Sequence, residues 1–152
     1  MLALLAFLLV GCLPDPARGQ ASRLLDELGR AHGALVQAWS GGSSVAPICD
    51  EIGGVDTRLT GEPSLVDLRP TWPALRAATD DLLAVCGQVR LLQTPARDSA
   101  AVRQARREWQ QGAERQLALA CGHLREAAAS LGRPGPECNL ATPAVVQNTN
   151  QP

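Results

Sequence analysis

The side chains best suited to chemistry in this protein belong to four cysteines: Cys49, Cys86, Cys121 and Cys138. Thiolates bind metals, exchange electrons and form disulfides. The four are widely spaced, unlike the CxxC pairs of zinc sites and thiol oxidoreductases. An even number of widely spaced cysteines is typical of disulfides in an oxidising compartment. We therefore expect two structural disulfides, no metal site and no redox role.

The order of the helices favours one pairing of these cysteines. Cys86 and Cys121 fall on two helices with a short link, and an antiparallel hairpin would place Cys86 opposite Ala105. At about 1.5 Å per residue, Cys121 would then lie roughly 24 Å away, beyond the reach of a bridge. The segment "GRPGPEC" can end a helix and run back along it, which brings Cys138 towards Cys121. The predicted pairs are Cys49 with Cys86 and Cys121 with Cys138.

The remaining titratable residues do not form a recognisable catalytic set. GxSxG, HExxH, a phosphate loop and a dinucleotide fingerprint are all missing. His32 lies near an apolar helix face and is predicted to be a packed histidine. His123 follows Cys121, but haem attachment needs CxxCH, so no cofactor is predicted. A minor hypothesis is an enzyme that uses an acidic loop over 48–68, which holds Asp50, Glu51, Asp56, Glu62 and Asp67.

Arg103, Arg106 and Arg107 form the densest basic cluster of the chain. Such a cluster is typical of a solvated helix face, and it is also a possible contact for an anionic partner. The formal net charge of the whole chain is only -1 at pH 7. Long-range attraction to nucleic acid is therefore not expected.

The apolar opening "MLALLAFLLVGC" contains the fifth cysteine, Cys12. Its apolar run is as long as the core of a signal peptide and shorter than the ~20 residues of a membrane-spanning helix. The stretch Leu9 to Cys12 resembles the bacterial lipobox, the processing site of prolipoproteins. The resemblance covers only the first dozen residues, and the chain departs from the usual leader because no Lys or Arg precedes the apolar run.

This resemblance implies an N-terminal lipid on Cys12, palmitate included, and removal of residues 1–11 as a signal peptide. Leu13, not Asp, follows the cysteine, which implies the outer membrane under the usual Gram-negative sorting rule. Residues 12–20 would be an extended, membrane-proximal tether, because two prolines disfavour a helix there. The alternative is an ordinary leader that is cut near Gly19 and Gln20, which would leave a freely secreted protein.

Three helices are expected from apolar periodicity. The first begins after an N-cap at Ser22 and ends at Gly41 and Gly42. The second begins near Thr71. The third begins after a cap at Thr94 or Asp98 and ends at Gly132. It is long enough to extend beyond the end of the second helix. Another part of the chain must therefore cover the overhanging turns, or the helix must bend near Gly112. The apolar positions of the first helix are Leu24 or Leu25, Leu28, Leu35 and Trp39. Those of the second helix are Leu75, Ala78, Leu82, Val85, Val89 and Leu92. Those of the third helix are Val102, Ala105, Trp109, Ala113, Leu117, Ala120, Leu124 and Leu131.

Between the first two helices, residues 40–70 are predicted to be long and irregular, with a short helix or an extended strand pinned by Cys49. The expected fold is thus an all-α bundle of three to four helices, stapled by two disulfides, over 21–138. Residues 139–152 are expected to be an extended or disordered tail. The sequence favours a cell-envelope lipoprotein with a non-catalytic binding or scaffolding role towards an envelope protein. The alternative is a secreted, cytokine-like helical signalling factor.

Overall fold

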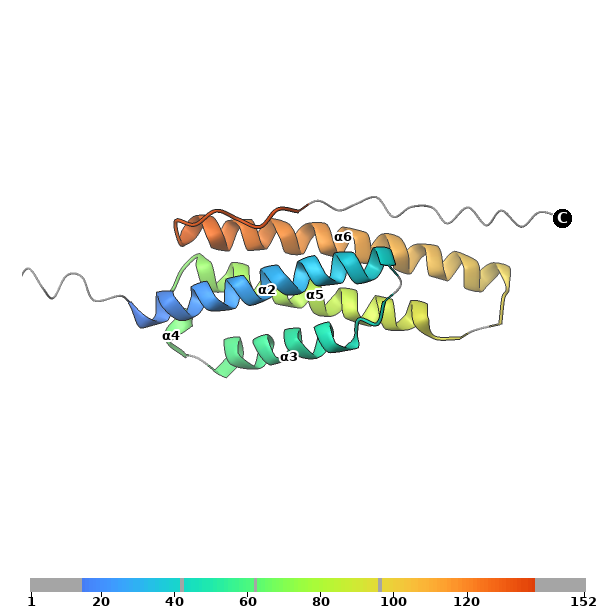
Figure 1. Cartoon of the computed structure of the whole chain (residues 1–152), viewed down its shortest axis with the longest axis horizontal. Coiled ribbons are helices and arrows are strands. Elements are labelled where there is room, and N and C mark those ends of the chain that lie inside the picture. Colours follow the sequence, from blue (N-terminus) through green and yellow to red (C-terminus); the bar gives the residue numbers. More distant parts are fainter. Residues whose placement is uncertain (1–14, 42, 62, 96, 139–152) are drawn as a thin grey trace, which may run out of the picture.

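The computed structural model describes residues 15–41, 43–61, 63–95 and 97–138. Within these residues the chain forms four long helices and one short helix and contains no strand. The all-α bundle with two disulfides is confirmed. In chain order the helices are α2 (Pro16–Gly41), α3 (Ala46–Gly61), α4 (Pro63–Val66), α5 (Thr71–Gln93) and α6 (Ala100–Ser130), as Figure 1 shows.

The hairpin of α5 and α6 is the centre of the bundle, and α2 and α3 pack against it. The two helices run antiparallel, as the short link between them predicts. Their predicted apolar stripes are buried from Leu75 to Val89 and from Ala113 to Leu131. The cap of α6 was predicted one or more residues too early. It is Ser99, whose Oγ accepts a hydrogen bond from the backbone N–H of Val102 (3.2 Å).

Helix α2 begins seven residues before the start that the sequence predicted. Asp15 accepts a hydrogen bond from the backbone N–H of Ala17 (3.0 Å), and Pro16 occupies the first helical position. Proline is well suited to that position, since its missing N–H would have no helical partner there. The predicted cap at Ser22 and the extended form of residues 16–20 are therefore wrong. The predicted end at Gly41 is confirmed.

Helix α3 replaces most of the irregular segment expected between the first two helices. Of the two forms proposed for this segment, the helix is correct, and its 16 residues make it longer than expected. Its buried face consists of Cys49, Ile52, Val55 and Leu59, which recur at helical steps. Arg58 binds Glu27 of α2, and this bond holds the pKa of the Glu27 carboxyl below its usual value.

The first turns of α6 overhang the bundle, as its predicted length implied (Figure 1). Val102, Ala105 and Trp109 continue the apolar stripe but remain partly exposed. Gly112 is buried where the stripe enters the core, and a Cβ on it would come within 2.8 Å of the Gln88 amide. Gly112 thus leaves room for the Gln88 side chain between α5 and α6.

Residues 131–138, which we call the strap, turn back from the end of α6. Gly132 has φ +69, and the N–H of Arg133 donates to the carbonyl oxygen of Ala128 (2.9 Å), which is the geometry of a Schellman cap. Arg133 then binds the Asp26 carboxylate of α2 (2.8 Å). The predicted stop at Gly132 and the predicted reversal are confirmed, and the strap joins α6 to α2.

Candidate functional site

Both predicted disulfide pairings are confirmed. Cys49 on α3 is bonded to Cys86 on α5, with a Cα–Cα distance of 5.8 Å. Cys121 on α6 is bonded to Cys138 in the strap, with a Cα–Cα distance of 6.0 Å. The first three of these residues are buried. All four therefore act as structural cross-links in this fold.

The register of the central hairpin differs from the one that the sequence suggested. Thr71 lies opposite Ser130, with their hydroxyls 2.6 Å apart, and Asp81 lies opposite His123. Residues near Glu114, rather than Ala105, therefore face Cys86. The shift arises because α5 continues to Gln93 and α6 begins only at Ala100, so the link is longer than the one assumed.

His123 and Asp81 form a pair that sequence reasoning did not identify. Nδ1 of His123 lies 2.9 Å from Oδ2 of Asp81, and the histidine side chain is about one-third exposed. A carboxylate that orients an imidazole is one half of a nucleophilic catalytic set. The other half is missing, because Nε2 of His123 makes no hydrogen bond with a described residue, and the α5 and α6 residues one helical turn away carry no hydroxyl or thiol. The pair therefore acts as a polar clamp between α5 and α6.

His32 is packed in the core, as predicted. Its side chain is only 2% exposed, and Nε2 donates a hydrogen bond to the backbone oxygen of Leu117 on α6 (3.0 Å). Burial lowers the pKa of His32, because the charged imidazolium would lose its hydration. His32 therefore joins α2 to α6 as a neutral side chain.

The acidic residues of 48–68 do not converge on either histidine. Asp50, Glu51 and Asp67 are exposed, and Asp56 binds Arg76 of α5 (2.8 Å). Glu62 lies outside the described residues. The enzyme hypothesis required these acids to meet His32 or His123 in a pocket, and that arrangement is not found in the described part of the chain.

The predicted arginine cluster lies on the overhang of α6, at the end of the bundle where α5 and α6 are joined. Arg103 binds Asp98 (2.9 Å), and Arg106 donates to the backbone oxygen of Thr94 (3.2 Å). Arg107 is exposed and makes no hydrogen bond or ion pair with a described residue. The cluster is therefore only partly neutralised by its own surroundings.

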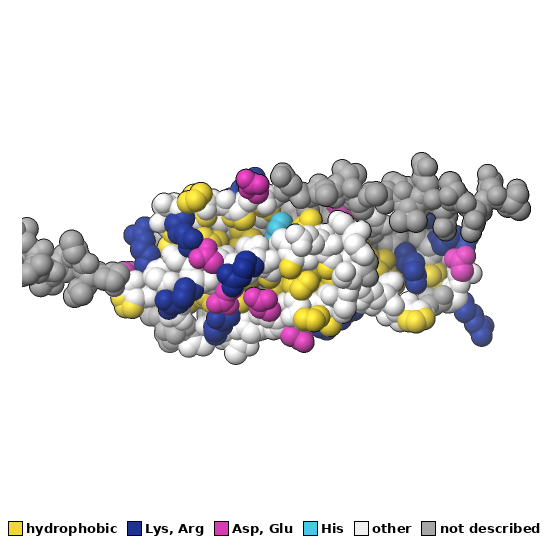
Figure 2. Space-filling view, in the orientation of Figure 1, with side chains coloured by type: hydrophobic (Ala, Val, Ile, Leu, Met, Phe, Trp, Pro, Cys, Tyr) yellow, Lys and Arg dark blue, Asp and Glu magenta, His cyan; other side chains and the backbone are white. Residues whose placement is uncertain are grey.

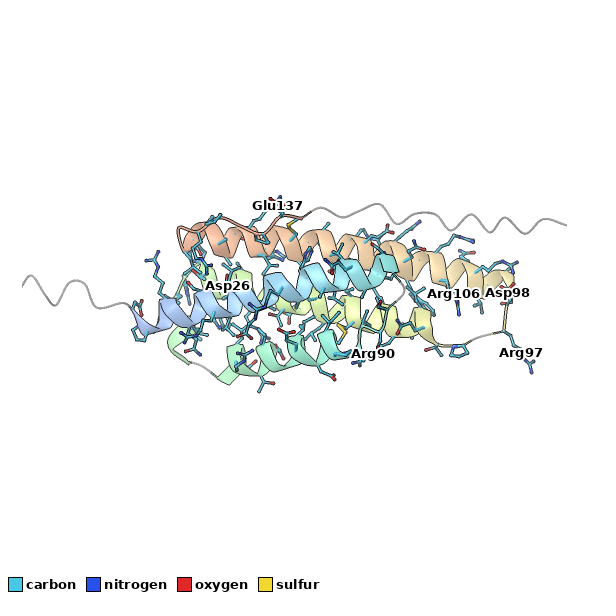
Figure 3. All side chains as sticks on the ribbon, in the orientation of Figure 1. Asp26, Arg90, Arg97, Asp98, Arg106 and Glu137 are labelled. Carbon is cyan, nitrogen blue, oxygen red and sulfur yellow. A yellow bond between two sulfur atoms is a disulfide. The ribbon has the colours of Figure 1, made fainter. Side chains whose placement is uncertain are left out.

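Two further arginines, which sequence reasoning missed, join this cluster. Arg90 at the end of α5 and Arg97 in the link are exposed, and their guanidinium groups also lack a partner among the described residues. Figure 3 labels Arg97 beside Asp98 at this end of the bundle, with Arg106 further in on α6 and Arg90 further in again on the side of α5. We call this surface the arginine end, and it consists of Arg90, Arg97, Arg103, Arg106 and Arg107.

Charge along the bundle is unevenly distributed. Residues 90–108 contain five arginines and two acidic residues, whereas the rest of the chain contains nine arginines and thirteen acidic residues. A net charge of +3 at one end thus stands against -4 over the rest. Figure 2 shows the same contrast on one face, with mainly basic side chains at the right-hand end and mixed charges elsewhere. The arginine end is therefore the surface best suited to an anionic partner.

Comparisons with protein families, with curated proteins and with solved structures found no match for this chain. In the described residues, no group of three or more His, Cys, Asp or Glu side chains is arranged to hold a metal ion. None of the described helices combines the length and the apolar character that crossing a membrane requires.

Proposed function

We propose that this protein is a cell-envelope lipoprotein, anchored through a lipid on Cys12, which binds or scaffolds an anionic envelope partner and does not catalyse a reaction. The observation that carries the proposal is that the two ends of the bundle differ. Pro16, the first helical residue after Cys12, lies at one end, and the arginine end lies at the other (Figure 1). A lipid and a basic surface would then work at opposite ends of one rigid body.

The dimensions suit such a bridge. Helix α2 has 26 residues, and α6 has 31, so the bundle would extend about 40–46 Å from its anchored end. Only Leu13, Pro14 and Asp15 separate Cys12 from α2, which would hold the domain close to the membrane. Three exposed arginines without partners would then face away from the membrane, where an acidic envelope protein could reach them. By the sorting rule for Leu13, that membrane is the outer membrane.

Intact mass spectrometry of the protein from its native host tests the anchor. We expect a mature chain that begins at Cys12 and carries added acyl mass. Reduction should add about four daltons, one hydrogen for each sulfur released from the two bridges. A chain without lipid that begins near Gln20 would refute the anchor and favour the secreted signalling factor.

The partner contact is tested by photo-crosslinking in living cells. A benzophenone amino acid in place of Gln104, which is exposed beside Arg103 and Arg107, should give a discrete crosslinked product with a protein that is acidic at the site of linkage. The same amino acid in place of Gln37, which is exposed on α2, serves as the matched control and should not give this product.

Neutralising the free arginines completes the test. The combined changes Arg90→Gln, Arg97→Gln and Arg107→Gln should reduce the crosslinked product at position 104 at least tenfold, because each removes a charge that the bundle does not pair. A product of unchanged yield, or equal products at positions 37 and 104, would refute the arginine end as the contact surface.

A further inference from the structure

A pocket lies between the N-terminal half of α2 and the strap. It has a volume of about 410 Å³ and is lined on α2 by Leu25, Asp26, Gly29 and Arg30. Residues 134–136 of the strap form its other wall. Small-molecule sites in proteins commonly have volumes of about 300–1,000 Å³. The pocket therefore has room for a ligand of about the size of a bicyclic ring system.

The strap is held firmly in the position that forms this wall. Its far end is bonded to α6 by the disulfide of Cys121 and Cys138. Its near end is fixed by Arg133, which binds Asp26 and donates to the backbone oxygen of Ser22 (3.2 Å). Gly135 lies so close to α6 that a Cβ on it would come within 2.8 Å of the Arg125 side chain. The pocket is therefore formed by the closed fold itself.

Gly29 keeps the pocket open. A glycine inside a helix costs about 1 kcal/mol relative to alanine, and α2 contains both Gly29 and Gly33 in its interior. Gly29 is the one of these two that lines the pocket, and a Cβ on it would meet no atom within 4 Å. Gly29 forms the floor of the pocket, beside the buried Leu25.

The charges around the pocket favour an anion. The Asp26 carboxylate accepts hydrogen bonds from both terminal nitrogens of Arg133, at 3.2 and 2.8 Å, so its charge is already matched. The Arg30 side chain is exposed at the pocket and makes no hydrogen bond or ion pair with a described residue, and its charge acts on the Glu27 carboxyl only at longer range. One guanidinium without a hydrogen-bonded partner thus stands beside walls of proline, glycine and leucine. A guanidinium binds a carboxylate through two parallel hydrogen bonds.

We infer that this pocket binds a small aromatic carboxylate, with the ring between the strap prolines and Gly29 and the carboxylate on Arg30. A flat ring suits walls that consist of two proline rings and glycine backbone, since these offer apolar surface without a projecting side chain. The site lies on the strap side of α2, away from the arginine end, and it goes beyond the proposed function. It does not require the lipid anchor.

Titration of the mature chain, with both disulfides intact, with 2-naphthoate tests this inference. We expect amide resonances of Leu25, Gly29 and Gly135 to shift in NMR spectra, with a dissociation constant of about 1 mM, as fragments of this size give. Arg30→Gln should weaken binding about tenfold, because it removes a charge-assisted hydrogen bond. The neutral 2-naphthamide should bind the unmodified protein about tenfold more weakly than 2-naphthoate does.

Gly29→Leu provides the decisive variant. Its side chain would point back along α2 over Leu25 and fill the pocket, so binding of 2-naphthoate should be lost. The melting temperature should nevertheless rise by about 2–4 °C, because leucine is more favourable than glycine in a helix interior. Gly54→Leu is the matched control: it lies on the exposed face of α3 with nothing within 4 Å of its Cβ. It should raise the melting temperature similarly and leave binding unchanged.

Three results would overturn the inference. One is the absence of any resonance shift at 10 mM 2-naphthoate. Another is unchanged affinity in Gly29→Leu, which would place the ligand elsewhere. The third is equal affinity of the Arg30→Gln variant and the unmodified protein, which would remove the anion site.

Discussion

Replacing Cys49 and Cys86 together by alanine lowers the free energy of unfolding by about 4 kcal/mol, the largest effect that we expect from any pair of substitutions. The bridge closes a loop between residues that are 37 apart, and the entropy that it removes from the unfolded chain corresponds to about 4 kcal/mol. It is also a covalent cross-link between α3 and α5. Helix α3 contains Gly53 and Gly54 and therefore depends strongly on packing.

Urea unfolding followed by circular dichroism measures this loss, with the Cys121→Ala and Cys138→Ala pair as the comparison. That bridge spans 17 residues, for which the same relation gives about 3 kcal/mol. Hydrogen exchange should show loss of protection in α3 for the first pair and in the strap for the second. The explanation is wrong if replacing Cys49 and Cys86 lowers the free energy of unfolding by less than 1 kcal/mol, or if α3 keeps its full protection from hydrogen exchange.

Stability falls as the pH is lowered below about 6.5, because of His32. Burial depresses its pKa in the folded protein, so the unfolded chain takes up a proton at higher pH than the folded chain does. The unfolded state thus binds more protons below the ordinary histidine pKa of about 6.5. The contribution of His32 to stability is complete above that pH and is lost as the pH falls towards its folded pKa. For one proton the slope is at most about 1.4 kcal/mol per pH unit.

Unfolding free energies at pH 7.5, 6.5 and 5.5 measure this slope. His32→Gln keeps an N–H that can reach the Leu117 oxygen but does not titrate, so the slope between pH 6.5 and 5.5 should be lost. His123→Gln, at the partly exposed clamp, is the matched control for loss of a histidine. An unchanged slope in His32→Gln would show that burial of this residue is not the cause.

The central hairpin could be predicted because its apolar residues repeat at helical steps over about five turns in α5 and about eight turns in α6. Leu75, Leu82 and Val89 on α5 and Leu117 and Leu124 on α6 are buried as the pattern indicated. A long apolar repeat still predicts a helix when single positions depart from the pattern. The short link between the two helices then leaves only an antiparallel arrangement. The predicted disulfide pairing is correct, although the register that supported it is wrong, because Cys86 faces residues near Glu114 and Cys121 is closer to it than the sequence indicated.

Helix α3 and the start of α2 could not be predicted in the same way. Gly53, Gly54 and Gly61 disfavour a helix locally, and packing against α2 and α5 overrides that preference. At the start of α2, two prolines suggested an extended tether, yet Pro16 directly after Asp15 is a good helix start. Local composition therefore gives the wrong prediction wherever tertiary contacts or caps decide the structure.

The surfaces now proposed as sites depend on contacts between distant parts of the chain. Arg90 and Arg97 join the predicted cluster only because α5 ends beside the overhang of α6. The pocket unites Gly29 with Gly135, which are more than a hundred residues apart. Asp81 is opposite His123 only in the true register of the hairpin. No spacing in the sequence marks these pairs as neighbours.

Each bridge joins cysteines that are consecutive among the four of the domain. A chain that enters an oxidising compartment from its N-terminus would expose Cys49 and Cys86 before Cys121 and Cys138. An oxidant that joins thiols in order of arrival would then make the native pairs without later reshuffling. Under the proposed function, the lipid also converts the Cys12 thiol into a thioether. The first thiol to emerge, and the one able to capture Cys49 wrongly, would thereby be removed from disulfide exchange.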